Sequence, residues 1–436
     1  MGGVTVGIDI GTTSVKAVAA GEDGVVLARC RIPHDLVAPS PDRFEHDPAQ
    51  AWSAGVLEAW RQARDGAGRP VAAMTVAAMV PSMCGVDASG RPVTPGLLYG
   101  DARGRADVDA GEAAGLAAWL AATSDADGLW PAQAVANHAL AGVGAIDTVT
   151  AMAMMPLFDG VRWDDGLCQR LGFDAAQLPA LSPGTAAIGE VDGVPLNGGT
   201  VDVFAEQLVA DAREPGDVLV LCGTTLITWA LTTGWPEVEG LWTVPYTLPG
   251  LTAVGGASNA GGLFVDSVRR LLGPVDEGEL DAIEPGDVPV WLPYLRGERT
   301  PLHDPHRRGE LLGLALGQGP AAVLRAAYEA TAFVVRHHVE LSGVAPRRVV
   351  AVGGGTRCAP WMQALADGTG LPVDVSAVPE GAALGAAFLA RVTAGLEADT
   401  SGAIAWSQIG QRMEPRPPWA EACEGRYTTF LERTRR

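Results

Sequence analysis

Lysine is almost absent from this chain of 436 residues, because Lys16 stands alone beside thirty arginines. A basic surface for nucleic acid is also lacking, since the net charge is −20 and no basic stretch offsets it locally. The same charge disfavours an anionic membrane surface, and no uninterrupted apolar run is long enough to span a bilayer. We therefore expect a small-molecule partner, with no nucleic acid and no membrane; a homodimer is compatible with the sequence.

Paired metal-binding and disulfide motifs are missing as well. The six cysteines are scattered without a Cys-x-x-Cys pair, which is typical of reduced, structural thiols in a cytoplasmic protein. The seven histidines contain no His-Glu-x-x-His, which argues against a zinc site. The N-terminus has no basic region and Asp9 interrupts its apolar run, so we expect no signal peptide.

Two common nucleotide motifs are also absent. No P-loop pattern Gly-x-x-x-x-Gly-Lys-[Ser/Thr] occurs, because the single lysine lies between Val15 and Ala17, and no Gly-x-Gly-x-x-Gly occurs either. Present instead is an apolar strand at residues 4–10 that contains Asp9, then the turn Gly11-Thr12-Thr13, then Lys16. Such a turn presents backbone N–H groups and two hydroxyls to an anion, and Asp9 is placed to hold a hydrated cation. A plain β-hairpin, with Lys16 as an exposed strand residue, is the alternative interpretation.

The sequence contains one internal repeat. Residues 6–15 can be laid over residues 219–226, so that Gly11-Thr12-Thr13 matches Gly223-Thr224-Thr225, although Leu221 takes the position of Asp9. The length also allows two domains of about 200 residues each. The repeat predicts two duplicated domains that both contact phosphate oxygens, with the metal held by the first.

The second half reads as alternating strands and helices. An apolar strand at residues 347–352 runs into Gly353-Gly354-Gly355, and a helix follows at 360–368. We also expect a helix that opens at residues 253–256 and continues through Val268, and an irregular connection at residues 179–199. A glycine-rich turn between strand and helix also occurs in α/β domains that bind no nucleotide.

In their order and spacing these motifs resemble the FGGY family of carbohydrate kinases. The resemblance runs from residue 4 to about residue 392, and its most specific part is the segment 292–301. Further segments similar to the family are residues 45–48 with Trp52, 87–92, 99–103, 199–202, 309–329 and 380–385. The resemblance implies an α/β fold of two duplicated ribonuclease H-like (actin-like ATPase) domains with a central cleft. Residues 1–211 would form the sugar and metal side, and residues 212–436 the nucleotide side.

The resemblance also implies an activity, the transfer of the γ-phosphate of ATP, with Mg²⁺, to a hydroxyl of a ketose, polyol or related sugar. Asp202 would be the catalytic base, although its other interpretation is a helix N-cap. Asp9 would hold the metal, and Lys16 and the glycine and threonine turns would contact phosphate or nucleotide. The family's adenosine motif corresponds to Gly353, Gly354 and Gly355 with residues 380–385, and its second phosphate motif corresponds to Gly223, Thr224 and Thr225.

The sugar side departs from the family. Met79, Val80 and Pro81, followed by Ser82, take the place of the Gln-Met-His-Gly of xylulose kinases. Tyr99, Asp101 and Arg103 are candidate sugar contacts, although an Asp/Arg pair is also an ordinary surface ion pair. The segment 130–159 is short and lacks the family's Pro-Lys-x-x-Trp signature. The alternative is therefore an inactive paralogue that acts as a sugar- or nucleotide-binding regulator.

Overall fold

The computed structural model describes residues 3–40, 42–105 and 111–435. Its contacts divide the chain into two compact units. Unit 1 spans Met1–Val209 and Glu380–Trp406, and unit 2 spans Ala210–Pro379 and Ser407–Arg436. The segment Glu380–Trp406 therefore packs with unit 1, although it lies in the half of the sequence assigned to the nucleotide side.

Unit 1 is built on a mixed sheet with β1 (Val4–Ile10) near its centre. β1 pairs antiparallel with β2 (Ser14–Ala20) and parallel with β6 (Val71–Ala78). All seven residues of β1 are buried, which fits its apolar sequence to a strand covered on both faces. The sheet also contains β3 (Val26–Pro33), β12 (Ala187–Val191), β13 (Val194–Asn197) and β14 (Thr200–Val201).

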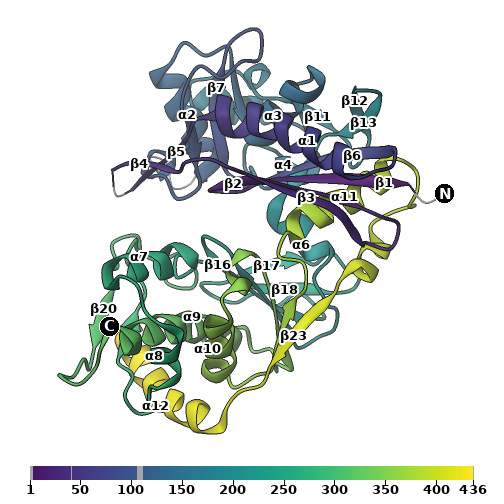
Figure 1. The fold of residues 1–436 in the computed structure, drawn as a ribbon. Coiled ribbons are helices and arrows are strands. Elements are labelled where there is room, and N and C mark those ends of the chain that lie inside the picture. Colours follow the sequence, from purple (N-terminus) through teal and green to yellow (C-terminus); the bar gives the residue numbers. More distant parts are fainter. Residues whose placement is uncertain (1–2, 41, 106–110, 436) are drawn as a thin grey trace. The chain divides into compact units, whose positions relative to one another are not determined.

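Helices cover both faces of this sheet (Figure 1). α1 (Gly55–Gly66) packs against β1, β2 and β3, and α11 (Gly381–Thr393) packs against β1 and β6 on the other side. A Cβ on Gly7 would lie 1.9 Å from the carbonyl oxygen of Ala383, so only glycine allows this approach of α11 to β1. The remaining helices of unit 1 are α2 (Glu112–Thr123), α3 (Ala132–Ala141), α4 (Thr148–Met152), α5 (Asp165–Arg170) and α6 (Asp202–Leu208).

A second sheet of unit 1 lies beside the first. Its strand order is β4 (Val37–Ser40), β5 (Arg43–His46), β8 (Gly96–Leu98), β7 (Ser82–Val86) and β9 (Gly128–Pro131). A short parallel pair is formed by β10 (Ala145–Asp147) and β11 (Ala180–Ser182). A π-helical turn at Ala49–Ala54 leads from β5 into α1 and buries Trp52.

Unit 2 repeats the arrangement of the first sheet. β15 (Asp217–Cys222) pairs antiparallel with β16 (Leu226–Thr232) and parallel with β21 (Arg348–Val352). Both units thus begin with an antiparallel hairpin, as the internal repeat predicted, and in both the first strand also has a parallel neighbour. The sheet also contains β17 (Trp242–Pro245), β18 (Thr252–Ser258), β22 (Val373–Ser376) and β23 (Ile409–Met413), and a separate pair is β19 (Val290–Leu292) with β20 (Glu310–Leu312).

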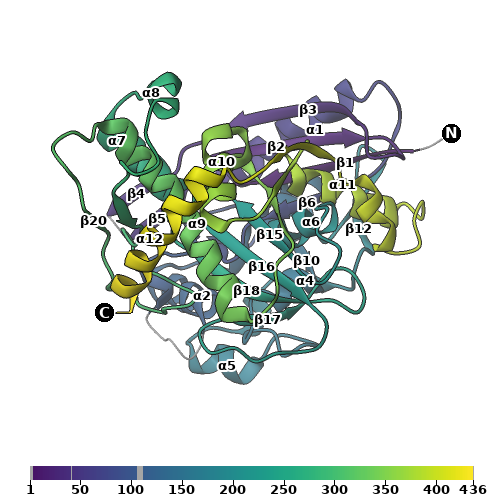
Figure 2. The ribbon, with the colours of Figure 1, turned by 90° about the horizontal axis from the view of Figure 1, so that it is seen from below.

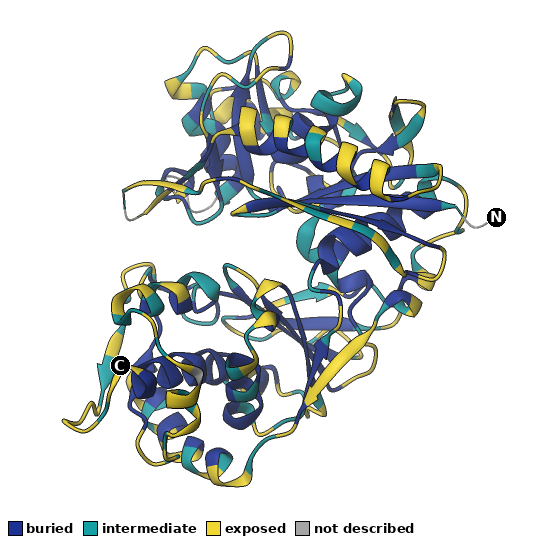
Figure 3. Ribbon diagram, viewed as in Figure 1, coloured by how far each residue is buried: buried dark blue, intermediate teal, exposed yellow. Residues whose placement is uncertain are grey.

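The helices of unit 2 form its hydrophobic core with this sheet. α9 (Pro320–Ser342) packs against α10 (Ala359–Thr369), and α10 packs in turn against α12 (Pro417–Thr434) (Figure 2). α7 (Gly262–Leu272) and α8 (Glu277–Asp281) also contact α9. Figure 3 shows that the central strands of each unit are buried, whereas exposed residues follow the outer faces of helices such as α1.

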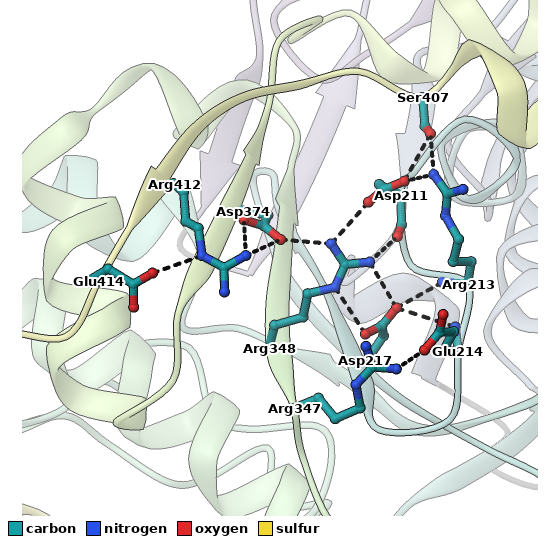
Figure 4. A network of polar contacts seen from close by, with 10 residues as sticks. All are labelled: Asp211, Arg213, Glu214, Asp217, Arg347, Arg348, Asp374, Ser407, Arg412 and Glu414. Atoms are coloured by element: carbon teal, nitrogen blue, oxygen red, sulfur yellow. Dashed lines mark hydrogen bonds and ion pairs between the residues drawn. The ribbon is translucent and has the colours of Figure 1, made fainter.

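One polar network ties neighbouring strands of unit 2 together (Figure 4). The Arg348 guanidinium on β21 donates to Asp217 on β15 at 3.0 Å and to Asp374 on β22 at 2.7 Å. It also reaches Asp211 at 2.9 Å. Hydrogen bonds from Arg348 and the backbone outweigh the effect of burial and lower the pKa of Asp217. The carboxylates of Asp211, Asp217 and Asp374 therefore have a structural role, in which they join neighbouring strands through Arg348.

Two expectations about local structure are wrong. Residues 253–256 lie in β18, and the helix that follows begins only at Gly262. A Cβ on Gly255 would be 1.9 Å from the carbonyl oxygen of Thr228 on β16, so these glycines serve close strand packing. The segment 179–199 contains β12 and β13, which form a hairpin. Within the described residues, no helix combines the length and apolarity needed to cross a bilayer.

Candidate active site

The carboxyl ends of three neighbouring strands of unit 1 bring together its candidate catalytic residues. On β6, Ala77 is paired with Asp9 of β1 on one side and with Thr200 of β14 on the other. Asp202 follows β14 and Met79 follows β6, so both continue from the same sheet edge. This edge is where α/β sheets hold their ligands.

Asp9 is buried beside the only lysine of the chain. Its Oδ2 accepts a hydrogen bond from the Lys16 Nζ at 3.1 Å, because the two residues face each other across the β1–β2 hairpin. Its other oxygen, Oδ1, is buried without a hydrogen-bond partner. Lys16 is thus half-buried in an ion pair, unlike the exposed strand residue of the alternative interpretation. The open Oδ1 gives Asp9 a site for a hydrated cation or its water.

Asp202 opens α6 immediately after β14. Its Oδ1 accepts a hydrogen bond from the backbone N–H of Val203 at 2.7 Å, and Val201 occupies the N-cap position. Burial of the carboxyl group raises the pKa of Asp202 to about 7, and the nearby Asp9 carboxylate adds to this rise. A carboxylate with such a pKa can take up a proton near neutral pH.

The turn Gly11-Thr12-Thr13 closes the β1–β2 hairpin, as predicted. The backbone N–H of Gly11 donates to the carbonyl of Ser14 at 3.1 Å. The hydroxyls of Thr12 and Tyr99 lie 3.1 Å apart, so a candidate phosphate contact and a candidate sugar contact meet here.

Two histidines support this turn and were missed as site residues in the sequence. Trp52 Nε1 donates to His46 Nδ1 at 3.1 Å, so His46 Nε2 carries the hydrogen and donates to the carbonyl of Thr12 at 2.8 Å. The ring of His34 packs edge-on against His46. Burial, with a smaller effect of His34, lowers the pKa of His46 to about 4. The resemblance of residues 45–48 and Trp52 to the family was the available signal, but it gave no hint of these bonds.

The other candidate sugar residues lie on two further segments. Asp101 and Arg103 form a buried ion pair in which Arg103 Nη2 contacts Asp101 Oδ2 at 2.7 Å. Arg103 also contacts Glu45 at 2.7 Å, so much of the polar capacity of the pair is used inside unit 1. Met79 is buried, whereas Val80 and Pro81 are half-buried and present no polar side-chain atom.

Unit 2 places its glycine-rich turns next to each other. Gly223-Thr224-Thr225 follows β15, and Gly353-Gly354-Gly355 follows the parallel neighbour β21. Cβ atoms on Gly353 and Gly355 would lie 3.1 and 2.8 Å from the carbonyl oxygen of Cys222, whereas a Cβ on Gly354 would meet nothing within 4 Å. Gly353 also has a φ of +91°, which favours glycine. The exposed backbone at Gly354 leaves room for a ligand to approach.

The donor set of unit 1 suits Mg²⁺ better than a metal held wholly by protein. Among the residues that the structure describes, no group of three His, Cys, Asp or Glu side chains could hold a metal ion. Mg²⁺ usually keeps several waters and binds one or two carboxylates together with substrate phosphates. The orphaned Oδ1 of Asp9, near Asp202, fits this requirement.

Comparison with known proteins gives two family matches that together cover most of the chain. The model of the FGGY family of carbohydrate kinases, N-terminal domain, matches residues 4–120, and that of the C-terminal domain matches residues 218–394. The xylulose kinase of Escherichia coli (strain K12) is 26% identical over 471 residues, which cover 98% of this chain and 97% of that protein. A glycerol kinase of Allorhizobium ampelinum is 28% identical and covers 95% of each chain. The crystal structure of xylulose kinase from Rhodospirillum rubrum has a TM-score of 0.77 at 27% identity, over 98% of each chain.

Proposed function

The chain belongs to the FGGY family of carbohydrate kinases and is an ATP-dependent phosphotransferase, and we propose that Asp202 is the base that accepts the proton of its sugar hydroxyl. The observation that supports this role is the position of Asp202 near Asp9, since β14 and β1 lie on either side of β6, together with the pKa of Asp202, which is raised to about 7. A carboxylate whose pKa lies near neutral pH is substantially ionised under working conditions and is still basic enough to accept a proton.

The proposed reaction is a direct transfer. The substrate oxygen forms a bond to the γ-phosphorus of ATP, the bond from that phosphorus to the β,γ-bridging oxygen breaks, and ADP leaves. The hydroxyl proton passes to a carboxylate oxygen of Asp202. Because the transition state of phosphoryl transfer is loose, positioning and charge neutralisation carry most of the catalysis, and Asp202 acts late.

We assign the metal and nucleotide to the groups that fit them. Asp9 would hold Mg²⁺ through its free Oδ1, and the ion when bound would neutralise charge on the phosphates. Lys16, paired with Asp9, would keep positive charge beside Gly11, Thr12 and Thr13. In unit 2, the second Gly-Thr-Thr turn and Gly354 would contact ATP through the backbone.

The substrate we infer is a ketose, polyol or related sugar. Tyr99 offers a hydroxyl beside the phosphate turn, and Asp101 and Arg103, engaged with each other, would hold its segment in place. Met79, Val80 and Pro81 make their part of the pocket apolar. Asp9 and Asp202 lie near each other and both Gly-Thr-Thr turns are intact, which favours an active kinase over the inactive regulator.

A screen of ATP consumption against ketoses, polyols and sugar acids tests the activity. With the best substrate, Asp202→Asn is expected to lower turnover by about 10² to 10⁴, the usual effect of a positioned base, and to leave ATP binding by calorimetry nearly unchanged. Asp65→Asn, an exposed carboxylate on α1, is the matched control and should behave as wild type. An Asp202→Asn variant with wild-type turnover would remove Asp202 from the mechanism.

A further inference from the structure

Helix α3 carries two buried carboxamide side chains one turn apart, Gln133 and Asn137. Gln133 Nε2 donates to the carbonyls of Ala78 at 3.0 Å and Thr200 at 3.1 Å. Asn137 Nδ2 donates to the carbonyls of Ala145 at 2.8 Å and Gly198 at 3.1 Å. Both N–H groups of each amide are therefore directed at backbone carbonyls of other segments.

The two carbonyls bound by Gln133 belong to segments that lead into the proposed site. Ala78 ends β6 and directly precedes Met79, whereas Thr200 stands two residues before Asp202. The ladder that joins these segments is short, because β14 pairs with β6 over only Thr200 and Val201. The side chain of Gln133 thus adds a cross-link where the backbone pairing is minimal.

The turn ahead of Asp202 has little freedom to move on its own. Gly199 has a φ of +89°, and a Cβ there would lie 2.7 Å from the carbonyl oxygen of Val76. Its N–H donates to Asn197 Oδ1 at 2.9 Å. The turn at residues 198–200 is thus held by hydrogen bonds with the side chains of Gln133, Asn137 and Asn197. Its position sets where α6 begins, and therefore where Asp202 lies.

We propose that Gln133 is a positioning residue for Asp202, with Asn137 in a supporting role. The proposal rests on the proposed function, since it takes Asp202 as the base. The chemistry requires an amide: Gln133 acts only as a donor here, because its Oε1 has no hydrogen-bond partner. Glutamate has the same shape, but its ionised form cannot donate, and methionine removes both bonds.

The expected effect falls on turnover. A misplacement of the base by about 1 Å costs on the order of 10²-fold in rate, so Gln133→Met and Gln133→Glu should lower kcat by about that factor. The KM for ATP should stay within about twofold, because no nucleotide contact is assigned to this segment. Gln177→Glu is the matched control: Gln177 also donates to a backbone carbonyl, that of Ala126 at 3.1 Å, but touches neither site segment.

A double-mutant cycle with Asp202→Asn separates positioning from a structural role. If Gln133 acts through Asp202, Gln133→Met should cost less than about twofold once Asp202 is already Asn. Equal losses in both backgrounds would overturn the proposal while leaving Asp202 as the base. Wild-type turnover of Asp202→Asn alone would instead refute the proposed function. If neither Gln133 variant folds, as judged by circular dichroism and thermal melting, Gln133 is a structural residue and the proposal fails.

Discussion

Acidification should weaken unit 1 through His46. This imidazole is buried, accepts a hydrogen bond from Trp52 and donates one to the Thr12 carbonyl. A second proton would place an N–H of His46 against the N–H of Trp52 and a charge inside the core. The pKa of His46 is accordingly lowered to about 4 in the folded chain, against about 6.5 for an unperturbed histidine.

The sign and size of the effect follow from proton linkage. Between pH 6.5 and 4 the unfolded chain holds the proton and the folded chain does not, so stability falls as the pH falls, by about 1.4 kcal/mol per unit. The contribution is fully present above pH 6.5. From pH 7 to pH 5 the expected loss from this one group is roughly 2 kcal/mol.

Hydrogen exchange followed by mass spectrometry at pH 7, 6 and 5 would measure this loss in the amides of β1 and β5. His46→Gln is the comparison, because glutamine does not titrate. The stability advantage of the wild type over the variant should shrink by about 2 kcal/mol from pH 7 to pH 5. His338, whose pKa is also lowered to about 4 by burial, lies in unit 2 and is reported by the amides of that unit. Parallel pH profiles for wild type and variant would refute the reasoning.

Three further predictions concern unit 2 and the substrate. Glu329→Gln should destabilise unit 2 by about 3 to 5 kcal/mol in urea unfolding, because it removes the carboxylate that the buried Arg325 and Arg426 share. Glu424→Gln removes an exposed partner of Arg336 and should cost under about 1 kcal/mol. Similar losses of stability in the two variants would contradict this prediction. Gly354→Val should weaken ATP binding in calorimetry by at least about 10-fold without unfolding, because its side chain enters open space; unchanged affinity would move the adenosine site elsewhere. D-xylulose should be a poor substrate, because two missing hydrogen bonds at about 1 to 3 kcal/mol each lower kcat/KM by roughly 30-fold to 10⁴-fold; a higher kcat/KM for D-xylulose than for every other sugar tested would refute this.

Local patterns predicted the elements that depend on neighbouring residues. The predicted strand at residues 4–10, its turn and its return strand are confirmed, because apolar periodicity and a glycine turn specify a hairpin by themselves. The missed hairpin of β12 and β13 also had a local signal, Asp192-Gly193 between two alternating runs. No local signal marked residues 253–256 as a strand where a helix was predicted, because the close approach of Gly255 to Thr228 exists only after β16 and β18 pair.

The candidate site was predictable as a set of residue types but not as an arrangement. Asp9 and Asp202 are 193 positions apart in the sequence, and their proximity depends on β14 adding to β6 beside β1. The roles of His46 and Gln133 depend on a few hydrogen bonds to residues of other segments, which no periodicity encodes. The resemblance to a family predicted the roles of the site residues, whereas the residues that hold them in place become visible only in the tertiary structure.

Because residues Glu380–Trp406 pack with unit 1, this unit cannot complete its fold until late in synthesis of the chain. The ribosome completes the β1 and β6 strands early, but α11, which covers them, emerges only after almost all of unit 2 has been synthesised. Until then a row of small and apolar side chains on the sheet stays uncovered, open to chaperones or to other nascent chains. A gene fragment that stops at residue 211 would keep this uncovered face permanently, so a soluble first half requires residues 380–406 to be supplied, as a fused segment or a separate peptide.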